Sequence, residues 1–280
     1  FSLILLLGVT SCNDWLTREP KDTMNDEQVF SSETTINSYL AGLYQRLPDA
    51  GCFATDFQTS FDEGMWGGNA MGTNTLVMSF SFMHYYDYNL IRDINYFIET
   101  LPKEVSSTVD QSHVDYYLAE ARFIRAMLFF RLANNYGDVP LFDYTLTIEE
   151  ANTIARSPKA DVIKFVRDEL NDIVGTLPTR QEYAAADNGR ITKGAAMTLL
   201  ARTYLYENDW QNVSSVCEKI INGEYGEYAL FSSYAGLFLP ENEYNSEVIL
   251  DMGYLLNLRT WSEMYDGIPL SVGGRVNGFA

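Results

Sequence analysis

The chain has 280 residues, of which 46% are hydrophobic and 14% aromatic, enough apolar surface for one large core or two smaller ones. It carries 38 Asp and Glu against 19 Lys and Arg, a formal net charge of −19, so we expect no nucleic-acid partner, because phosphate backbones bind basic surfaces. The 2 histidines and 3 cysteines have no zinc-type spacing and are too few for a disulfide framework, so no metal site is expected.

The first residues have the pattern of an export signal. Residues 1–9 are nearly all apolar and lead into Thr10, Ser11 and Cys12, after which the chain turns polar. The run is too short for a transmembrane helix, which needs about 20 apolar residues, and is typical of a signal peptide. Small residues before a cysteine form a lipobox, in which the cysteine thiol accepts diacylglycerol. The alternatives are a plain secretory signal with an incidental cysteine, or a short buried helix.

We therefore predict a lipoprotein signal peptide over residues 1–11 and a lipidated tether over residues 12–29, with the lipid on Cys12. The acidic chain offers no basic patch for a bilayer, so the membrane anchor is the lipid. The domain that follows is predicted over residues 30–280. It is expected to be incomplete at its C-terminus, because no closing helix follows the glycines near residue 273.

Apolar residues recur at helical spacing through much of this domain, which predicts helices that bury one face. Four stripes come before residue 180: Ile36, Leu40, Leu43 and Leu47; then Tyr88, Ile91, Ile94, Ile98 and Leu101; then Ala121, Ile124, Leu128, Leu132 and Tyr136; then Val162, Phe165, Val166, Leu170, Ile173 and Leu177.

Helix ends are marked by residues with capping chemistry. The third helix is predicted to begin at a capping box formed by Ser112 and Asp115, and to end at Gly137. The fourth is predicted to begin with Ser157 as its N-cap and Pro158 in its first turn.

Two further helices, capped by Thr192 and Asp209, are predicted to form a hairpin that resembles a tetratricopeptide unit. The first carries Leu200, Ala201 and Tyr204 in the order of that repeat, where a small residue lets two helices approach closely. The second carries Val213, Cys217, Ile220 and Ile221. One such unit cannot bury its apolar face alone, so the earlier helices are expected to stack against it.

The predicted fold class is therefore all-α, built from tetratricopeptide-like helical hairpins with long irregular loops. One exception is the β-branched run over residues 248–250, which predicts a short strand.

No arrangement of residues points to catalysis. His84 and His113 lie in no His-Glu-x-x-His motif, and no Gly-rich phosphate loop precedes a helix. Asp62 and Glu63 are a weak version of the acid pair of a glycosidase, because neighbouring acids are common in a chain this acidic. We expect a protein that is not an enzyme and needs no cofactor, with a glycosidase as a minor alternative.

Residue types that suit ligand binding are concentrated in the loop over residues 49–81. This loop has no sustained hydrophobic periodicity and is rich in Gly, Asn, Met and aromatic residues. Long loops of this kind are often functional. Sugars present apolar C–H faces ringed by hydroxyls, so their sites combine flat aromatic rings with polar side chains. The segment that runs from Asp62 and Glu63 through Trp66 to Asn69 offers that mixture, so we predict that these four residues contact a glycan. The alternative for Trp66 is an anchor that packs the loop onto the helices.

Several motifs follow one another along nearly the whole chain: Cys12-Asn13-Asp14-Trp15-Leu16 with Pro20; Tyr39-Leu40-Ala41-Gly42-Leu43-Tyr44; the series Tyr88, Ile91, Asn95; Ala121-Arg122-Phe123-Ile124-Arg125-Ala126 leading to Asn135-Tyr136-Gly137-Asp138-Val139-Pro140-Leu141; Thr192-Lys193-Gly194-Ala195-Ala196 with Leu200-Ala201; and Asn245-Ser246-Glu247-Val248-Ile249. The turn around Gly137 is the most specific. In this order the motifs resemble the SusD/RagB family of Bacteroidetes outer-membrane lipoproteins, which capture nutrient glycans for import.

The resemblance implies a non-catalytic protein with an all-helical fold, lipid-anchored at the outer membrane and exposed on the cell surface. Its expected partners are an oligosaccharide or polysaccharide and a SusC-like TonB-dependent outer-membrane barrel, which the tetratricopeptide face would meet. Part of the family's glycan surface is the loop that matches residues 62–74 here, which adds Asn74 to the predicted contacts. The rest comes from the second half of the family's length, which would follow Ala280. The alternative is a tetratricopeptide-type scaffold lipoprotein that binds a protein or peptide.

Overall fold

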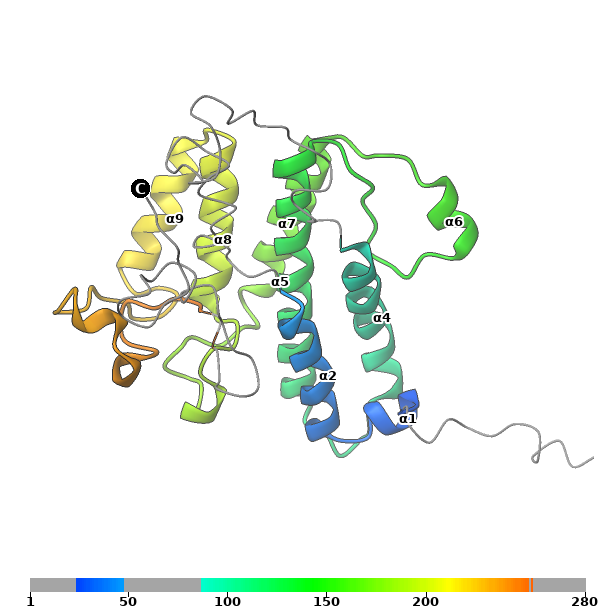
Figure 1. Ribbon diagram of the computed structural model, residues 1–280, viewed down its shortest axis with the longest axis horizontal. Coiled ribbons are helices and arrows are strands. Elements are labelled where there is room, and N and C mark those ends of the chain that lie inside the picture. Colours follow the sequence, from blue (N-terminus) through cyan, green and yellow to red (C-terminus); the bar gives the residue numbers. More distant parts are fainter. Residues whose placement is uncertain (1–23, 48–86, 252, 254–280) are drawn as a thin grey trace, which may run out of the picture.

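The computed structural model describes residues 24–47, 87–251 and 253, and every regular element within these ranges is a helix (Figure 1). The α-helices are α1 Asp26–Val29, α2 Glu33–Gln45, α4 Tyr88–Glu104, α5 Gln111–Tyr136, α6 Ile148–Thr153, α7 Lys159–Ile173, α8 Lys193–Tyr206 and α9 Trp210–Ile221. Three short 3-10 turns span Ala185–Asp187, Gly236–Phe238 and Pro240–Asn242. The predicted all-α fold class is confirmed.

Helix α5 is the centre of the packing. Its 26 residues make a rod about 39 Å long, and it packs against α2, α4, α7 and α8. Because neighbours surround it, its buried residues extend beyond the predicted stripe and include the charged Glu120 and Arg125. None of the helices in the described ranges is both long and apolar enough to span a bilayer.

Helices α7, α8 and α9 stand side by side in chain order (Figure 1), and α8 packs against both of the others. Leu200 and Ala201 of α8 are buried, as the tetratricopeptide pattern predicted. In α9 the prediction of the apolar face was partly wrong. Val216 is its buried residue, whereas Ile221 is 78% exposed, because among the described residues α9 packs chiefly against α8 and its far side stays open.

The predicted starts of α5 and α7 were wrong by one or two residues. Helix α5 is capped by Asp110, whose carboxylate accepts the backbone N–H of Ser112 at 2.8 Å, so Ser112 lies inside the first turn. The N-cap of α7 is Pro158 and not Ser157, whose backbone pairs with that of Val139 in an antiparallel bridge. The side chain that caps the first turn of α7 is that of Asp138, whose carboxylate accepts a hydrogen bond from the backbone N–H of Lys159 at 2.9 Å.

Gly137 ends α5 as predicted, in the left-handed region with φ of 72°. The chain then leaves the bundle as an arm over residues 143–157, which carries α6 at its tip (Figure 1). The base of the arm is held by buried side chains. Asn95 donates to the carbonyl of Tyr144 at 3.0 Å, and Arg125 donates to the carbonyl of Asp143 at 2.9 Å.

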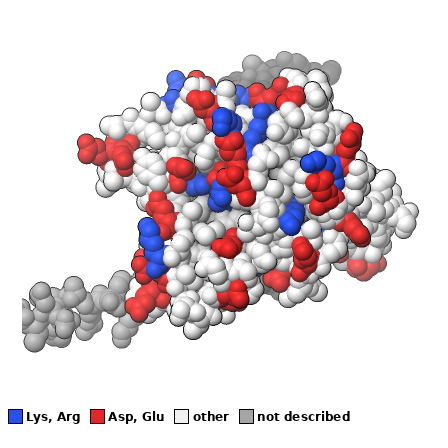
Figure 2. All heavy atoms as spheres, turned by 180° about the vertical axis from the view of Figure 1, so that it is seen from behind, with Lys and Arg blue, Asp and Glu red and all other residues white. Residues whose placement is uncertain are grey.

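Charged residues of both signs lie next to one another on one face of the molecule. Figure 2 shows Lys and Arg next to Asp and Glu on the face turned away from Figure 1. The salt bridges in the described ranges include Lys159 with Glu207 and Lys164 with Asp168. Such exposed pairs contribute little to folding.

Candidate functional site

The predicted functional residues lie outside the part of the chain that the structure describes. This holds for the lipidation residue Cys12 and for the predicted glycan contacts Asp62, Glu63, Trp66, Asn69 and Asn74. Their roles stay predictions. The described residues form a different candidate site, which the sequence did not indicate.

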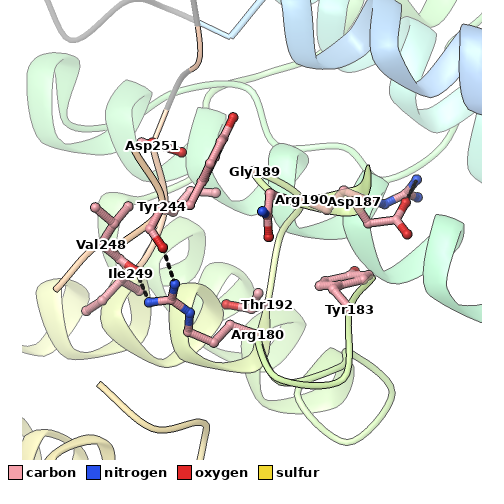
Figure 3. Close-up of a pocket in the computed structure, with 12 residues that line it drawn as sticks. Arg180, Tyr183, Asp187, Gly189, Arg190, Thr192, Tyr244, Val248, Ile249 and Asp251 are labelled. Carbon is pink, nitrogen blue, oxygen red and sulfur yellow. Dashed lines mark hydrogen bonds and ion pairs between the residues drawn. The ribbon is translucent and has the colours of Figure 1, made fainter. Parts of the chain in front are cut away.

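That site is a pocket between the loop that joins α7 to α8, residues 180–192, and the segment 244–251 (Figure 3). Its volume is about 360 Å³ including the space at its open mouth. Figure 3 draws Tyr244 and Asp251 on one side of the pocket and Tyr183, Asp187 and Arg190 on the other.

Arg180 fixes one wall of the pocket by binding three backbone carbonyls. Its guanidinium donates to the carbonyl of Asn245 at 2.7 Å, to that of Val248 at 3.2 Å, and to that of Tyr244. These contacts explain why the strand predicted over residues 248–250 was wrong. The Val248 carbonyl is occupied by a side chain, and no described strand lies beside it.

Tyr244 has a backbone conformation that is rare for a bulky residue, with φ of 55°. Left-handed backbone at a residue other than glycine costs on the order of 1–3 kcal/mol and persists only where the surroundings enforce it. The contacts from Arg180 enforce it here. The Tyr244 ring also lies against Gly189, where an added Cβ would be 3.5 Å from the ring, and the φ of +91° at Gly189 independently favours glycine.

The other wall rests on a buried carboxylate. Glu120 of α5 is fully buried and accepts two hydrogen bonds from Arg190, at 2.8 and 3.0 Å. Tyr44 of α2 donates its hydroxyl to the same carboxylate, and its oxygen accepts the backbone N–H of Ile191 at 3.0 Å. Tyr183 donates to the carbonyl of Ile191 at 3.0 Å. The loop is thus tied to α5 and to α2.

Burial decides the electrostatics of this cluster. It raises the pKa of Glu120, although Arg190 and the tyrosine hydroxyls act to lower it. Burial also raises the pKa of Tyr44 well above its usual value, with the Glu120 charge adding to the effect. Burial likewise raises the pKa of Tyr183, so Tyr44 and Tyr183 both stay neutral hydrogen-bond donors at physiological pH.

Asp251 differs from Glu120, because no arginine or tyrosine side chain within the described residues donates a hydrogen bond to its carboxylate. Burial raises the pKa of its carboxyl group, the nearby Glu243 raises it further, and Arg180 and a bond from its own backbone N–H lower it. No salt bridge to Asp251 occurs within the described residues. The same part of the chain contains no group of three or more His, Cys, Asp and Glu arranged to hold a metal ion.

A pair of exposed aromatic rings lies beyond the pocket. Tyr234 and Phe238 are 82% and 70% exposed and pack edge to face with their centroids 5.4 Å apart. Leu230, 86% exposed, belongs to the same segment. These residues could not be identified from the sequence, because single aromatic residues in an irregular segment have no diagnostic spacing.

Comparison of the sequence with protein families and with individual proteins gives consistent results. Residues 14–205 match the profile of a SusD-like family described as starch-binding and associating with the outer membrane. A SusD-like protein from Formosa agariphila is 24% identical over 277 residues, which cover 92% of this chain and 51% of that protein. A SusD-like protein from Bacteroides ovatus is also 24% identical, with 94% of this chain and 51% of that protein covered.

Solved structures show the same fold. A SusD-like carbohydrate-binding protein from Bacteroides fragilis superposes with a TM-score of 0.66 at 26% identity, covering 80% of this chain and 47% of that one. A laminarin-binding SusD-like protein superposes with a TM-score of 0.65 at 24% identity, covering 79% of this chain and 51% of that one. The chain thus spans about half the length of these relatives.

Proposed function

Because this chain belongs to the SusD-like family of starch-binding proteins that associate with the outer membrane, we propose that it captures oligosaccharide or polysaccharide at the cell surface. The family match carries this proposal, since it covers the helical bundle from α1 to nearly the end of α8. The solved relative from Bacteroides fragilis, described as carbohydrate-binding, supports the same class of ligand. In this proposal the protein holds the glycan and performs no chemistry on it.

The proposed binding loop includes Asp62, Glu63, Trp66, Asn69 and Asn74. The support for this loop is its composition, because an indole ring stacks on the C–H face of a sugar while carboxylates and amides bind its hydroxyls.

The proposed anchor is a lipid on Cys12, which follows a signal peptide over residues 1–11. A tether over residues 12–29 leads to the domain over residues 30–280. Where the structure describes the end of the tether, α1 packs against α2 and the next residue, Phe30, is fully buried. The lipid would thus hold the bundle close to the outer membrane, exposed on the cell surface.

The proposed partner is a SusC-like TonB-dependent barrel in the outer membrane, which would import the glycan that this protein captures. The support is the family's association with the outer membrane and the helical-hairpin architecture that this chain shares with it.

The test of glycan capture is affinity electrophoresis in gels that contain starch, laminarin, xylan or a mannan. We expect one of these polysaccharides to retard the wild-type chain and Trp66→Ala to abolish the retardation. The matched control is Trp210→Ala, which removes an indole that is 61% exposed on α9 and should leave the retardation unchanged. If no polysaccharide retards the wild type, the proposed substrate class is wrong. If Trp66→Ala migrates like the wild type, only the binding loop is wrong.

The test of the anchor is metabolic labelling with a radioactive fatty acid. Label should enter the protein in cells that make the wild type and should be absent from the Cys12→Ser variant. Incorporation into Cys12→Ser would contradict the assignment.

A protein or peptide ligand is the second candidate, favoured by one observation. Trp210 and Ile221 leave apolar surface on the open side of α9, as a helical hairpin does where another helix binds. Binding of a carbohydrate by the isolated chain separates the two proposals, because a protein-binding scaffold would not be retarded in any of the gels.

A further inference from the structure

We propose that the pocket between residues 180–192 and 244–251 is a second sugar-binding subsite, which holds one ring of a neutral glycan through Asn188, Tyr244 and Asp251. This inference rests on the proposed function but not on the loop that contains Trp66. It concerns described residues alone.

The polar groups of the pocket fall into two sets. Arg180, Tyr183, Asp187, Arg190 and Thr192 are committed to the fold through bonds to carbonyls, to Glu120 and to Tyr228 and through the salt bridge between Asp187 and Arg190. Asn188, Tyr244 and Asp251 also line the pocket, but within the described ranges their side chains make no hydrogen bond to another side chain. The second set is therefore available to a ligand.

The chemistry of the second set matches a polyol. A carboxylate accepts bonds from two hydroxyls, an amide both donates and accepts, and the tyrosine hydroxyl does the same. A carboxyl group that is partly desolvated without a cationic partner gains from hydroxyl donors that replace lost water. The raised pKa of Asp251 reflects this desolvation.

The charges of the pocket argue against an anionic ligand. Arg190 is paired with Glu120 and Asp187, and Arg180 is bound to three carbonyls, while the carboxylate of Asp251 lines the same space without a salt bridge in the described ranges. A phosphate or a uronate would therefore meet the Asp251 charge, with both guanidinium groups already engaged. A metal ion is disfavoured as well, because the described residues contain no cluster with the required ligands.

The pocket is preformed. Arg180 holds the strained backbone of Tyr244 in place, and the ring of Tyr244 is fixed against Gly189. A ring held in this way loses little conformational freedom on binding, which favours affinity. The pocket is open to solvent on one side, which suits one ring of a longer chain whose other rings stay outside.

The test is a titration of isotope-labelled protein, followed by amide NMR, with maltotriose, laminaritriose, xylotriose and mannotriose in turn. At least one trisaccharide should shift the amide resonances of Asn188 and Gly189 in a saturable way. Asp251→Asn should weaken this titration about tenfold or more, as expected for a lost bond to a charged group. Tyr244→Phe, which keeps the ring against Gly189, should weaken it about threefold to tenfold.

Two controls separate the outcomes. Asp168→Asn removes an exposed carboxylate on α7 and should leave the titration unchanged, and the spectra themselves report whether each variant is folded. In Trp66→Ala the shifts at Gly189 should persist. If a gel polysaccharide retards the wild type but no trisaccharide shifts Gly189, the subsite is wrong and the proposed function stands. If the wild type binds no glycan in either assay, both fail.

Discussion

Arg190 donates two hydrogen bonds, at 2.8 and 3.0 Å, to the carboxylate of Glu120, a side chain with no exposed surface in the middle of the central helix. The pair joins the loop before α8 to α5. Arg190 also donates to the side-chain oxygen of Asn37 in α2 at 3.0 Å, so one guanidinium bridges three parts of the chain.

We predict that Arg190→Ala is severely destabilising. The substitution leaves the Glu120 carboxyl group buried without its cation, a change that costs about 3–5 kcal/mol in the free energy of unfolding. Urea denaturation followed by circular dichroism measures this loss. Lys164→Ala is the control, because it breaks an exposed pair with Asp168 and should leave stability nearly unchanged. Equal losses of unfolding free energy in both variants would mean that the buried contact between Arg190 and Glu120 stabilises the fold no more than an exposed salt bridge does.

Stability should also depend on pH through Glu120. Burial raises the pKa of this carboxyl group in the folded state above its value of 4.5 in the unfolded chain. In the window between the two values the folded state binds the extra proton, so this contribution to stability is full below pH 4.5 and falls as pH rises through the folded pKa.

The contribution is isolated by comparison with Glu120→Gln, which cannot titrate at this position. The free energy of unfolding of the wild type, less that of Glu120→Gln, should decrease as pH rises from 4.5 toward neutrality. Urea titrations at several pH values give both curves. A difference that increases with pH would show that Arg190 outweighs burial.

Gly194 is predicted to tolerate no side chain. A Cβ at this position would lie 2.1 Å from the hydroxyl oxygen of Tyr228 and 2.6 Å from its ring. Gly194→Ala should therefore lower the free energy of unfolding by about 1–3 kcal/mol, as overpacking does. The penalty should shrink in a Tyr228→Ala background.

Gly42 provides the matched control for this substitution. It lies inside α2 with nothing within 4 Å of an added Cβ, so Gly42→Ala should raise stability by about 0.4–1 kcal/mol. A loss at Gly42 comparable to that at Gly194 would mean that the contact with Tyr228 is not the cause of the loss at Gly194.

Asn95 is predicted to control the arm that carries α6. Its amide donates to the carbonyl of Tyr144, and its oxygen accepts a bond from Arg125 at 2.7 Å. Asn95→Ala should loosen the base of the arm, so amide hydrogen exchange at Thr145 should accelerate about tenfold for a loss of ~1.4 kcal/mol. Asn171→Ala removes an exposed amide bond within α7 and should leave exchange at Thr145 unchanged. If exchange at Thr145 is unchanged in Asn95→Ala, contacts other than those of Asn95 hold the arm in place.

Capping residues and apolar spacing in the sequence made many helix ends and buried helix faces predictable. Thr192 and Asp209 cap α8 and α9 as their sequence contexts indicate, because a short polar side chain before an apolar run has few other uses. The apolar stripe of α2 is buried as expected, and so is that of α5 except for Tyr136, which is half-buried. The start of α5 was missed because Asp110 and Ser112 are both good capping residues two positions apart, and only the observed bond distinguishes them.

Tertiary contacts made the candidate site unpredictable. Arg180 binds the carbonyl of Tyr244, 64 residues away, and nothing in the sequence around either residue encodes that pairing. The carbonyls carry no side-chain signal at all. The buried position of Glu120 was hidden for a similar reason. A charged residue on a helix ordinarily faces water, and only the arrival of Arg190 and Tyr44 from other elements makes its burial favourable.

The bond between the Tyr44 hydroxyl and the Ile191 backbone has a consequence for the order of assembly during synthesis. The two residues are 147 positions apart in the sequence. Asn37 and its partner Arg190 are still farther apart, at 153 positions. At ~5–20 residues per second, a ribosome needs roughly 7–30 s after Tyr44 to make its partner. For that interval α2 has no access to the contacts that tie it to the far loop. Helix α2 is therefore among the first of the described helices to be made and among the last to form all of its contacts.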